Sequence, residues 1–124
     1  MQAAEIGDEN IVIRLLQKGA DVDTVNGGLW VSVLYGHDNL VRIFHEHGGD
    51  VNNEGTPLII SAERGHLTTT ILLLDLGAEI NLQDDDGDTA LMKAMKGGHS
   101  ELANELKTRE ADESIQNTKG DGQM

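Results

Sequence analysis

The most densely charged stretch of the sequence is an acidic run, Asp84-Asp85-Asp86-Gly87-Asp88. Its carboxylates are the kind of oxygen ligand that Ca²⁺ prefers. An EF-hand loop with its glycine at 87 would need an acidic first ligand at position 82 and a glutamate at position 93. Those positions hold Leu82 and Lys93. We therefore interpret the run as the acidic tip of a turn and predict no metal site, with a weak surface site for cations as the alternative.

Histidine follows glycine three times, as His37, His66 and His99. If these residues start equivalent stacked helices, they lie about 8 to 10 Å apart. Zinc–nitrogen bonds are only about 2.0 to 2.1 Å long, so two of them are not expected to share one ion. His45 and His47 are two positions apart on a helical segment and therefore face different ways. We interpret this second pair as surface residues.

The sequence offers no nucleophile with a recognisable catalytic partner. It contains no cysteine and no G-x-S-x-G elbow. Ser32 and Ser61 recur at a small-residue position of a helix, where packing explains them. The glycine pairs at 27–28, 48–49 and 97–98 lack the spacing of a phosphate-binding loop. We predict that the chain is not an enzyme and holds no cofactor. An enzyme would require turnover that fails on a single His or Asp substitution.

Charge and composition narrow the class of partner. The 124 residues include 9 Lys and Arg against 22 Asp and Glu, a formal net charge of −13. This field disfavours nucleic acid and anionic membranes and favours a basic protein partner. The longest aliphatic run, 71–74, is far shorter than the roughly 20 residues of a membrane span, and we see no secretory signal. Because the chain has no cysteine, we expect a cytoplasmic protein. Because aromatic residues make up only 2% of the sequence, we expect an aliphatic core.

A repeated register organises the whole chain. Turn glycines at 7, 36, 65 and 98 are each followed, at the same distance, by a second stop at Gly19, Gly48, Gly77 and Glu110. The segment after each turn carries apolar residues at helical spacing, for example Leu40, Val41 and Phe44. The segment before it has small residues that let helices approach closely. Such faces are buried by stacking helix pairs, so we predict an all-α repeat solenoid of four units.

The motifs in this register resemble those of the ankyrin repeat family. Thr56-Pro57-Leu58-Ile59 matches the family tetrapeptide in three of its four positions, and Thr89-Ala90-Leu91-Met92 matches it in two. The resemblance implies stacked helix-turn-helix units with short β-hairpin connections, and a structural histidine at the start of each second helix. We expect an ankyrin-like domain over residues 1–112, with units at about 1–23, 24–52, 53–81 and 82–112. Residues 113–124 are expected to form a frayed tail.

The sequence departs from the family pattern at its first two junctions. The spacing is 29 residues from Gly7 to Gly36 and from Gly36 to Gly65, against 33 from Gly65 to Gly98. We expect the first two hairpins to be cut short and the one at 80–89 to be complete. Gly27-Gly28-Leu29-Trp30 replaces the tetrapeptide and has no Thr or Pro to fix a helix start. That junction is predicted to be the loosest, and 115–121 resembles the start of a fifth hairpin.

Family members bind partners through hairpin tips and the ends of the first helices, so the resemblance implies where contacts fall. Transferred position by position, the predicted partner-binding residues are Leu34, Tyr35, Glu63, Arg64, Lys96, Asp85, Asp86 and Asp88. Tyr35 is the best single anchor, because an aromatic residue supplies contact area at low entropic cost. We expect a monomeric protein-interaction module. The alternative is a scaffold or regulatory fragment of a larger multidomain protein with a catalytic or channel segment elsewhere.

Overall fold

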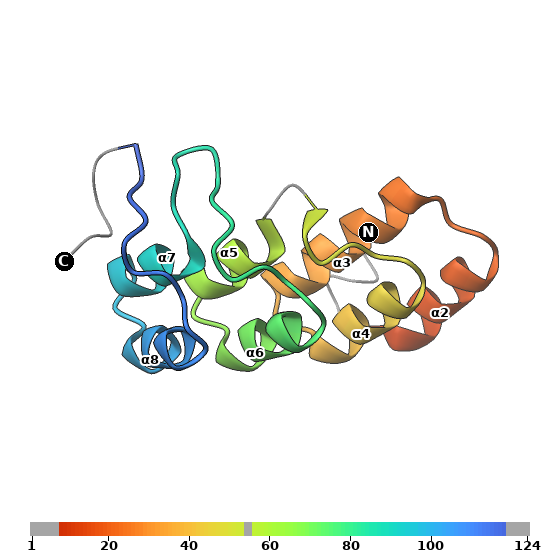
Figure 1. Ribbon diagram of the computed structural model, residues 1–124. Coiled ribbons are helices and arrows are strands. Elements are labelled where there is room, and N and C mark those ends of the chain that lie inside the picture. Colours follow the sequence, from red (N-terminus) through yellow and green to blue (C-terminus); the bar gives the residue numbers. More distant parts are fainter. Residues whose placement is uncertain (1–7, 54–55, 119–124) are drawn as a thin grey trace.

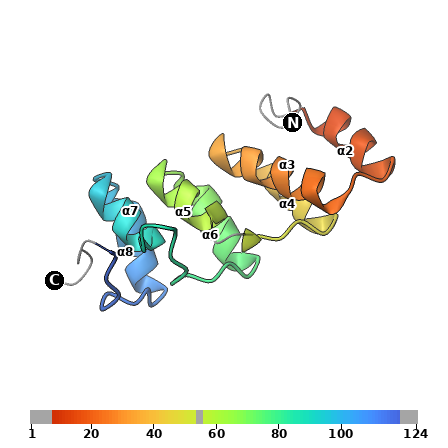
Figure 2. The same cartoon turned by 90° about the horizontal axis from the view of Figure 1, so that it is seen from above.

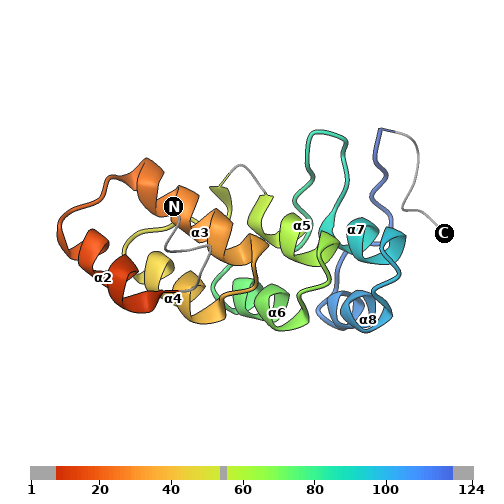
Figure 3. The ribbon, with the colours of Figure 1, turned by 180° about the vertical axis from the view of Figure 1, so that it is seen from behind.

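The computed structural model describes residues 8–53 and 56–118, and within these ranges the regular structure is helical, without a β-strand. Figure 1 shows α3, α5 and α7 in one layer and α2, α4, α6 and α8 in the other. The same layers are visible from behind in Figure 3, and Figure 2 shows the helix pairs following one another in a row. This arrangement confirms the predicted all-α repeat solenoid. In order, the helices are α2 (Glu9–Gln17), α3 (Val22–Leu34), α4 (Asp38–Glu46), α5 (Thr56–Glu63), α6 (Leu67–Asp75), α7 (Ala90–Lys96) and α8 (Ser100–Thr108).

No helix in the described part of the chain has the length and apolar character needed to cross a membrane. The segment predicted as the first helix of the first unit, residues 2–6, lies outside the described residues. So do residues 119–124, the last part of the predicted tail.

Each helix pair is joined by the same tight turn. Gly36, Gly65 and Gly98 have φ values of +69°, +72° and +72°, a left-handed conformation that glycine adopts without strain. The histidine amide that follows donates to a carbonyl five residues back, as from His66 N to Ser61 O at 2.9 Å. The glycine–histidine register read from the sequence therefore fixes the helix boundaries.

The histidines connect neighbouring units. His66 Nε2 donates to the carbonyl of Leu34 at 3.1 Å, and His99 Nε2 donates to the carbonyl of Glu63 at 3.1 Å. Each ring therefore binds the end of the first helix of the preceding unit. These bonds confirm the structural role that the family resemblance implied, and they hold the ends of α3 and α5 in place. We call this series the histidine ladder.

A second series of bonds was not predicted from the sequence. Asn52 Oδ1 accepts from Glu79 N at 2.9 Å, and Asn81 Oδ1 accepts from Asp112 N at 2.8 Å. Asn26 Oδ1 accepts from Asp50 N at 2.9 Å in the same way. Asn52 and Asn81 thus join successive connections between units, whereas Asn26 joins α3 to the connection after α4. Asn52 and Asn81 recur four residues after the stop glycines Gly48 and Gly77, and this was the signal available in the sequence.

The junction before α3 differs from the prediction. No shortened hairpin is present there, because α3 begins at Val22 and runs through Gly27 and Gly28. Asp21 caps the helix, its side chain accepting from Thr24 N at 2.8 Å. Gly28 is buried against Phe44, where an added Cβ would lie 2.3 Å from the ring. Gly28 therefore permits close packing, which corrects the view that these glycines leave the helix start unfixed.

The core is aliphatic, as the composition predicted. Its largest fully buried side chains include Leu29, Leu40, Phe44, Leu73 and Leu106. Burying one such side chain contributes about 1.5 to 3 kcal/mol, so this continuous cluster is the main source of stability. Two of the three threonines of α6, Thr69 and Thr70, are also fully buried, at positions that are apolar in other units.

The buried threonines have hydrogen-bond partners. Thr70 Oγ1 donates to His66 O at 2.8 Å and lies 2.8 Å from Ser61 Oγ. Thr69 Oγ1 donates to the carboxylate of Asp38 in the preceding unit. Because every hydroxyl is paired, burial of these polar groups carries little penalty.

Candidate partner-binding face

The connection between α6 and α7, residues 79–89, forms a protruding finger (Figure 1). Its tip is a turn centred on Asp84, whose Oδ1 accepts from the backbone amides of Asp86 and Asp88, both at 2.9 Å. The Gly87 amide donates to Asp84 O at 2.9 Å, and Gly87 has a φ of +78°. The expected full-length connection is present, as an irregular finger without paired strands in its described residues.

Asp88 lies at the base of the finger and is only 3% exposed. Lys96 Nζ lies 3.1 and 3.3 Å from its two oxygens, and Asn117 Nδ2 donates to Oδ1 at 2.6 Å. Burial raises the pKa of the Asp88 carboxyl, but hydrogen bonds from Asn117, Lys96 and Lys93 and the charge of Lys96 outweigh it, so this pKa lies below its usual value. Asp88 therefore holds the finger in place, and its burial removes it from the surface to which the sequence analysis assigned it.

Lys93 is a central residue that the sequence analysis missed. Its ammonium lies 3.1 Å from Glu63, 3.4 Å from Asp88 and 3.7 Å from Asp84. Burial lowers the pKa of Lys93, but its bonds and charge interactions with Glu63 and Asp88 raise it above the usual value. Lys93 thus connects α5 to the finger. Its spacing of three residues from Lys96, on the same helix face, was the available signal.

The acidic run at the tip forms a turn held by internal bonds. Carboxylate oxygens of Asp84, Asp86 and Asp88 all lie within 4.8 Å of one another. However, Asp84 Oδ1 accepts from two backbone amides, and Asp88 faces two lysines and an asparagine. This geometry favours the interpretation of the run as an acidic turn.

The segment after α8 lies beside the finger. Thr118 N donates to Asp86 O at 3.0 Å, and Gln83 Nε2 donates to Gln116 O at 3.3 Å. Asn117 is 8% exposed and bonds to Asp88. Up to Thr118 the segment predicted as a frayed tail is therefore packed against the finger, because its asparagine completes the buried Asp88 network.

The remaining predicted contacts lie on the surface. We call the C-terminal ends of α3, α5 and α7 the first-helix edge, and these helices lie side by side (Figure 2). Tyr35 is 50% exposed and stacks on His37 with ring centroids 6.2 Å apart. Arg64 is exposed, whereas Leu34 is half-buried. The exposed residues that complete this set are Glu63 and Lys96 on the edge and Asp85 and Asp86 on the finger.

The structure brings some of these residues together. Glu63 and Lys96 share one network with the finger, through Lys93 and Asp88. Asp85 and Asp86 extend this acidic surface at the tip. Tyr35 belongs to the end of α3, a different unit from the finger. The face therefore has an aromatic part and a charged part.

The family to which this geometry belongs is decided by comparison with known sequences. A family model for ankyrin repeats, in three copies, matches residues 1–84. The chain belongs to the ankyrin repeat family. Ankyrin repeats are generally protein–protein interaction modules, and the family is typically non-catalytic. The ankyrin geometry continues beyond the match, since Thr89 caps α7 through Met92 N and His99 continues the histidine ladder.

Proteins with similar sequences are much longer than this chain. Ankyrin repeat and SOCS box protein 6 of Mus musculus is 34% identical over 106 residues, which is 77% of this chain and 25% of the relative. Potassium channel AKT2/3 of Arabidopsis thaliana is 30% identical over 122 residues, 94% of this chain and 15% of the channel. Probable E3 ubiquitin-protein ligase XBOS33 of Oryza sativa subsp. japonica is 43% identical over 51 residues, 41% of this chain and 10% of the ligase. The chain thus spans a quarter or less of these relatives.

Proposed function

We propose that this ankyrin chain binds a protein partner through the first-helix edge and the tip of the finger. The observation that carries the proposal is the combination of exposure and rigid support at these positions. Tyr35 is half exposed at a helix end whose neighbouring carbonyl is held by His66. The finger is fixed at its base by Asp88. A preorganised surface loses little entropy on binding.

The charge of the face supports a basic partner. Asp85 and Asp86 are exposed at the finger tip, and the whole chain has a net charge of −13. Complementary charge accelerates encounter and suppresses wrong partners, and its effect decreases with salt. Tyr35 supplies an apolar anchor, and charged residues can form the rim around such an anchor.

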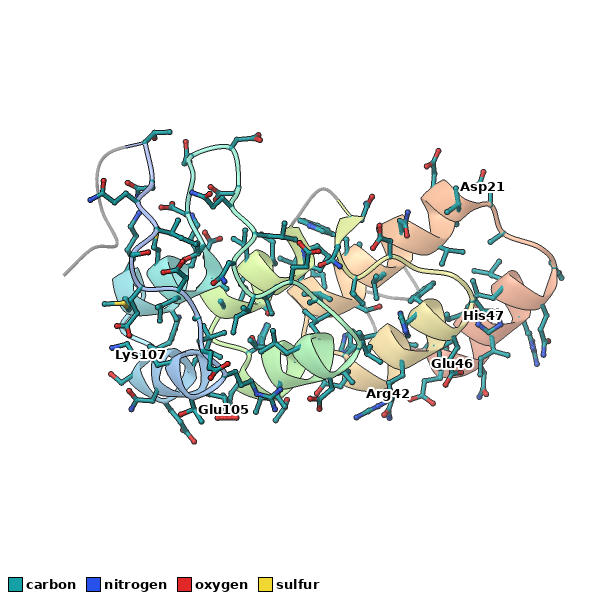
Figure 4. The ribbon with its side chains drawn as sticks, viewed as in Figure 1. Asp21, Arg42, Glu46, His47, Glu105 and Lys107 are labelled. Carbon is teal, nitrogen blue, oxygen red and sulfur yellow. The ribbon has the colours of Figure 1, made fainter. Side chains whose placement is uncertain are left out.

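A paired substitution tests the face. Tyr35→Ala combined with Asp86→Lys should abolish capture of the main partner, measured by quantitative mass spectrometry of proteins retained from a lysate. The control combines Gln17→Ala with Glu46→Lys, which makes the same kinds of change at exposed residues in the layer of α2 and α4 (Figure 4). Both proteins should keep their helical circular dichroism. Equal capture by the two variants would refute the assigned face.

We also propose that the chain has no catalytic activity of its own. A general acid or base works best with a pKa near the operating pH. Here the pKa of Asp88 is lowered and that of Lys93 is raised, so the two groups remain charged near neutrality. Their charges support the finger. We further propose a cytoplasmic location, which fractionation of cells tests, and a monomeric state, which sedimentation velocity tests.

A second candidate is a regulatory or scaffold role within a larger protein. It is supported by the relatives, of which this chain spans 25%, 15% and 10%. One of those relatives is named as a potassium channel and another as a probable ubiquitin ligase. Sequencing the full transcript decides between the two candidates. A transcript that encodes these 124 residues alone would eliminate the second.

A further inference from the structure

A groove of about 310 Å³ lies between α6 and α8, in the layer of second helices and away from the finger (Figure 1). The first-helix edge takes no part in it. Its lining comes from two neighbouring units: Leu67 and Ile71 of α6, with Glu101, Asn104, Glu105 and Thr108 of α8.

The floor of the groove is apolar. Leu67 and Ile71 are one helical turn apart on α6, so they lie on the same side of the helix, and both are half-buried. The equivalent positions of α4, counted from its histidine, hold Asp38 and Arg42. Stacking of the units therefore does not require apolar residues at these two positions. At the α6–α8 junction they form an apolar surface for an aliphatic chain, which the α4–α6 junction lacks.

The wall of the groove is acidic. Glu101 and Glu105 are one turn apart on α8 and both line the groove. Figure 4 shows Glu105 at the lower edge between the α6 and α8 ribbons, with Lys107 on the other side of α8. Glu101 is exposed, on the first turn of its helix. The lysine of α8 thus does not neutralise this wall from within the groove.

Arg109, which is not part of the groove lining, pairs with one of the two glutamates of the wall. Arg109 Nη1 lies 3.0 Å from Asp75 Oδ1, and Arg109 Nε lies 3.4 Å from Glu105 Oε1. Arg109 thereby bridges the end of α6 and the acidic wall of α8. A guanidinium thus pairs with the Glu105 carboxylate from within the chain, which leaves Glu101 as the second carboxylate of the wall.

We propose that this groove docks an arginine side chain of a basic segment in a protein partner. The aliphatic stem of the arginine lies on Leu67 and Ile71, and its guanidinium pairs with Glu101. Long cationic side chains combine these two contacts, burying the stem while the charged head stays near water. The net charge of −13 attracts such a segment. This site is separate from the first-helix edge and does not depend on it.

The experiment uses the full chain with methyl-labelled isoleucine and leucine, followed by NMR. The probe is the peptide acetyl-Ala-Leu-Arg-Ala-Leu-Arg-Ala-amide, and its control replaces both arginines by citrulline, a neutral analogue of nearly the same shape. The arginine peptide should shift the Ile71 and Leu67 methyl signals saturably. The citrulline peptide should leave them in place.

Two matched variants separate the groove from general charge attraction. Glu101→Gln and Glu46→Gln each remove one exposed negative charge, on α8 and α4 respectively. Glu101→Gln should weaken the binding of the arginine peptide at least about fivefold, because the charge-assisted hydrogen bond to its guanidinium is lost. Glu46→Gln should change binding by less than about twofold, because its charge is distant and screened. Spectra of both variants without peptide report that the fold is retained.

Several outcomes would overturn the proposal. Equal weakening by the two variants, or binding of the citrulline peptide, would show that no specific guanidinium site exists. Shifts centred on the methyl signals of Leu34 or Leu82 would instead place the peptide on the first-helix edge or the finger. That result would leave the proposed function intact and refute docking in this groove. Shifts of Ile71 that depend on protein concentration without peptide would identify a second copy as the occupant.

Discussion

Substituting Gly28 by alanine should destabilise the protein, whereas the same change at the adjacent Gly27 should stabilise it. Both glycines lie inside α3, where alanine is intrinsically favoured over glycine by about 1 kcal/mol. A Cβ at Gly27 would meet nothing within 4 Å. A Cβ at Gly28 would lie 2.3 and 2.4 Å from two ring carbons of Phe44. The two substitutions therefore share their backbone effect and differ in packing alone.

The magnitude follows from the burial of Phe44. Its ring is fully buried, so it cannot move into solvent to make room for a methyl group. Overpacking a closed core costs about 1 to 3 kcal/mol, and a contact this short belongs at the upper end. After the gain of about 1 kcal/mol from helix propensity, we expect a net loss of about 2 kcal/mol for Gly28→Ala. For Gly27→Ala we expect a gain of about 0.5 to 1 kcal/mol.

Urea unfolding followed by circular dichroism at 222 nm measures both changes, since the midpoint shifts while the slope stays constant. Adding Phe44→Leu to Gly28→Ala should recover part of the loss, because the smaller side chain frees space for the new methyl group. A double-mutant cycle isolates this coupling. If Gly28→Ala stabilised the protein as much as Gly27→Ala, the close contact between α3 and α4 would be refuted.

Three further predictions test other parts of the structure. Glu110 has a φ of +70° where the other units have glycine, so Glu110→Gly should stabilise the protein by about 0.5 to 1 kcal/mol in urea unfolding. Because the folded-state pKa of Asp88 is lowered, its contribution is present above its unfolded pKa of about 3.9 and is lost as pH falls through the lower folded value. Unfolding of Asp88→Asn should accordingly depend less on pH below about 4 than unfolding of the parent. Asn52→Ala removes bonds to Glu79 N and Gly77 O and should cost about 1 kcal/mol, whereas Asn10→Ala, at an exposed α2 position, should cost little.

The sequence was sufficient for the features that depend on short-range patterns. The glycine–histidine pairs located each inner turn, because a left-handed glycine followed by a helix start is a local requirement. The spacing of apolar residues located the second helices, including Leu40 and Phe44 in the core. The difference between 29 and 33 residues identified a junction that carries a full-length finger, at residues 79–89.

What the sequence analysis missed depends on contacts between distant residues. The burial of Asp88 follows from Asn117, 29 positions away, which cannot be paired with it by local reasoning. The role of Lys93 could not be predicted for the same reason, because one of its partners, Glu63, lies on another unit. The start of α3 was misjudged for a local reason: Asp21 caps the helix by accepting from Thr24 N, six residues before Gly27, where the absence of Thr or Pro had been taken to leave the helix start unfixed. Propensity is a weak guide when tertiary packing, here against Phe44, favours glycine.

The histidine ladder has a consequence for how such a chain can change during evolution. Its acceptors are main-chain carbonyls, those of Leu34 and Glu63, so the bond does not depend on which side chain occupies the receiving position. One unit has leucine there and the next has glutamate, yet both bonds measure 3.1 Å. Side chains at these two helix ends can therefore change without removing the acceptor of the stacking bond.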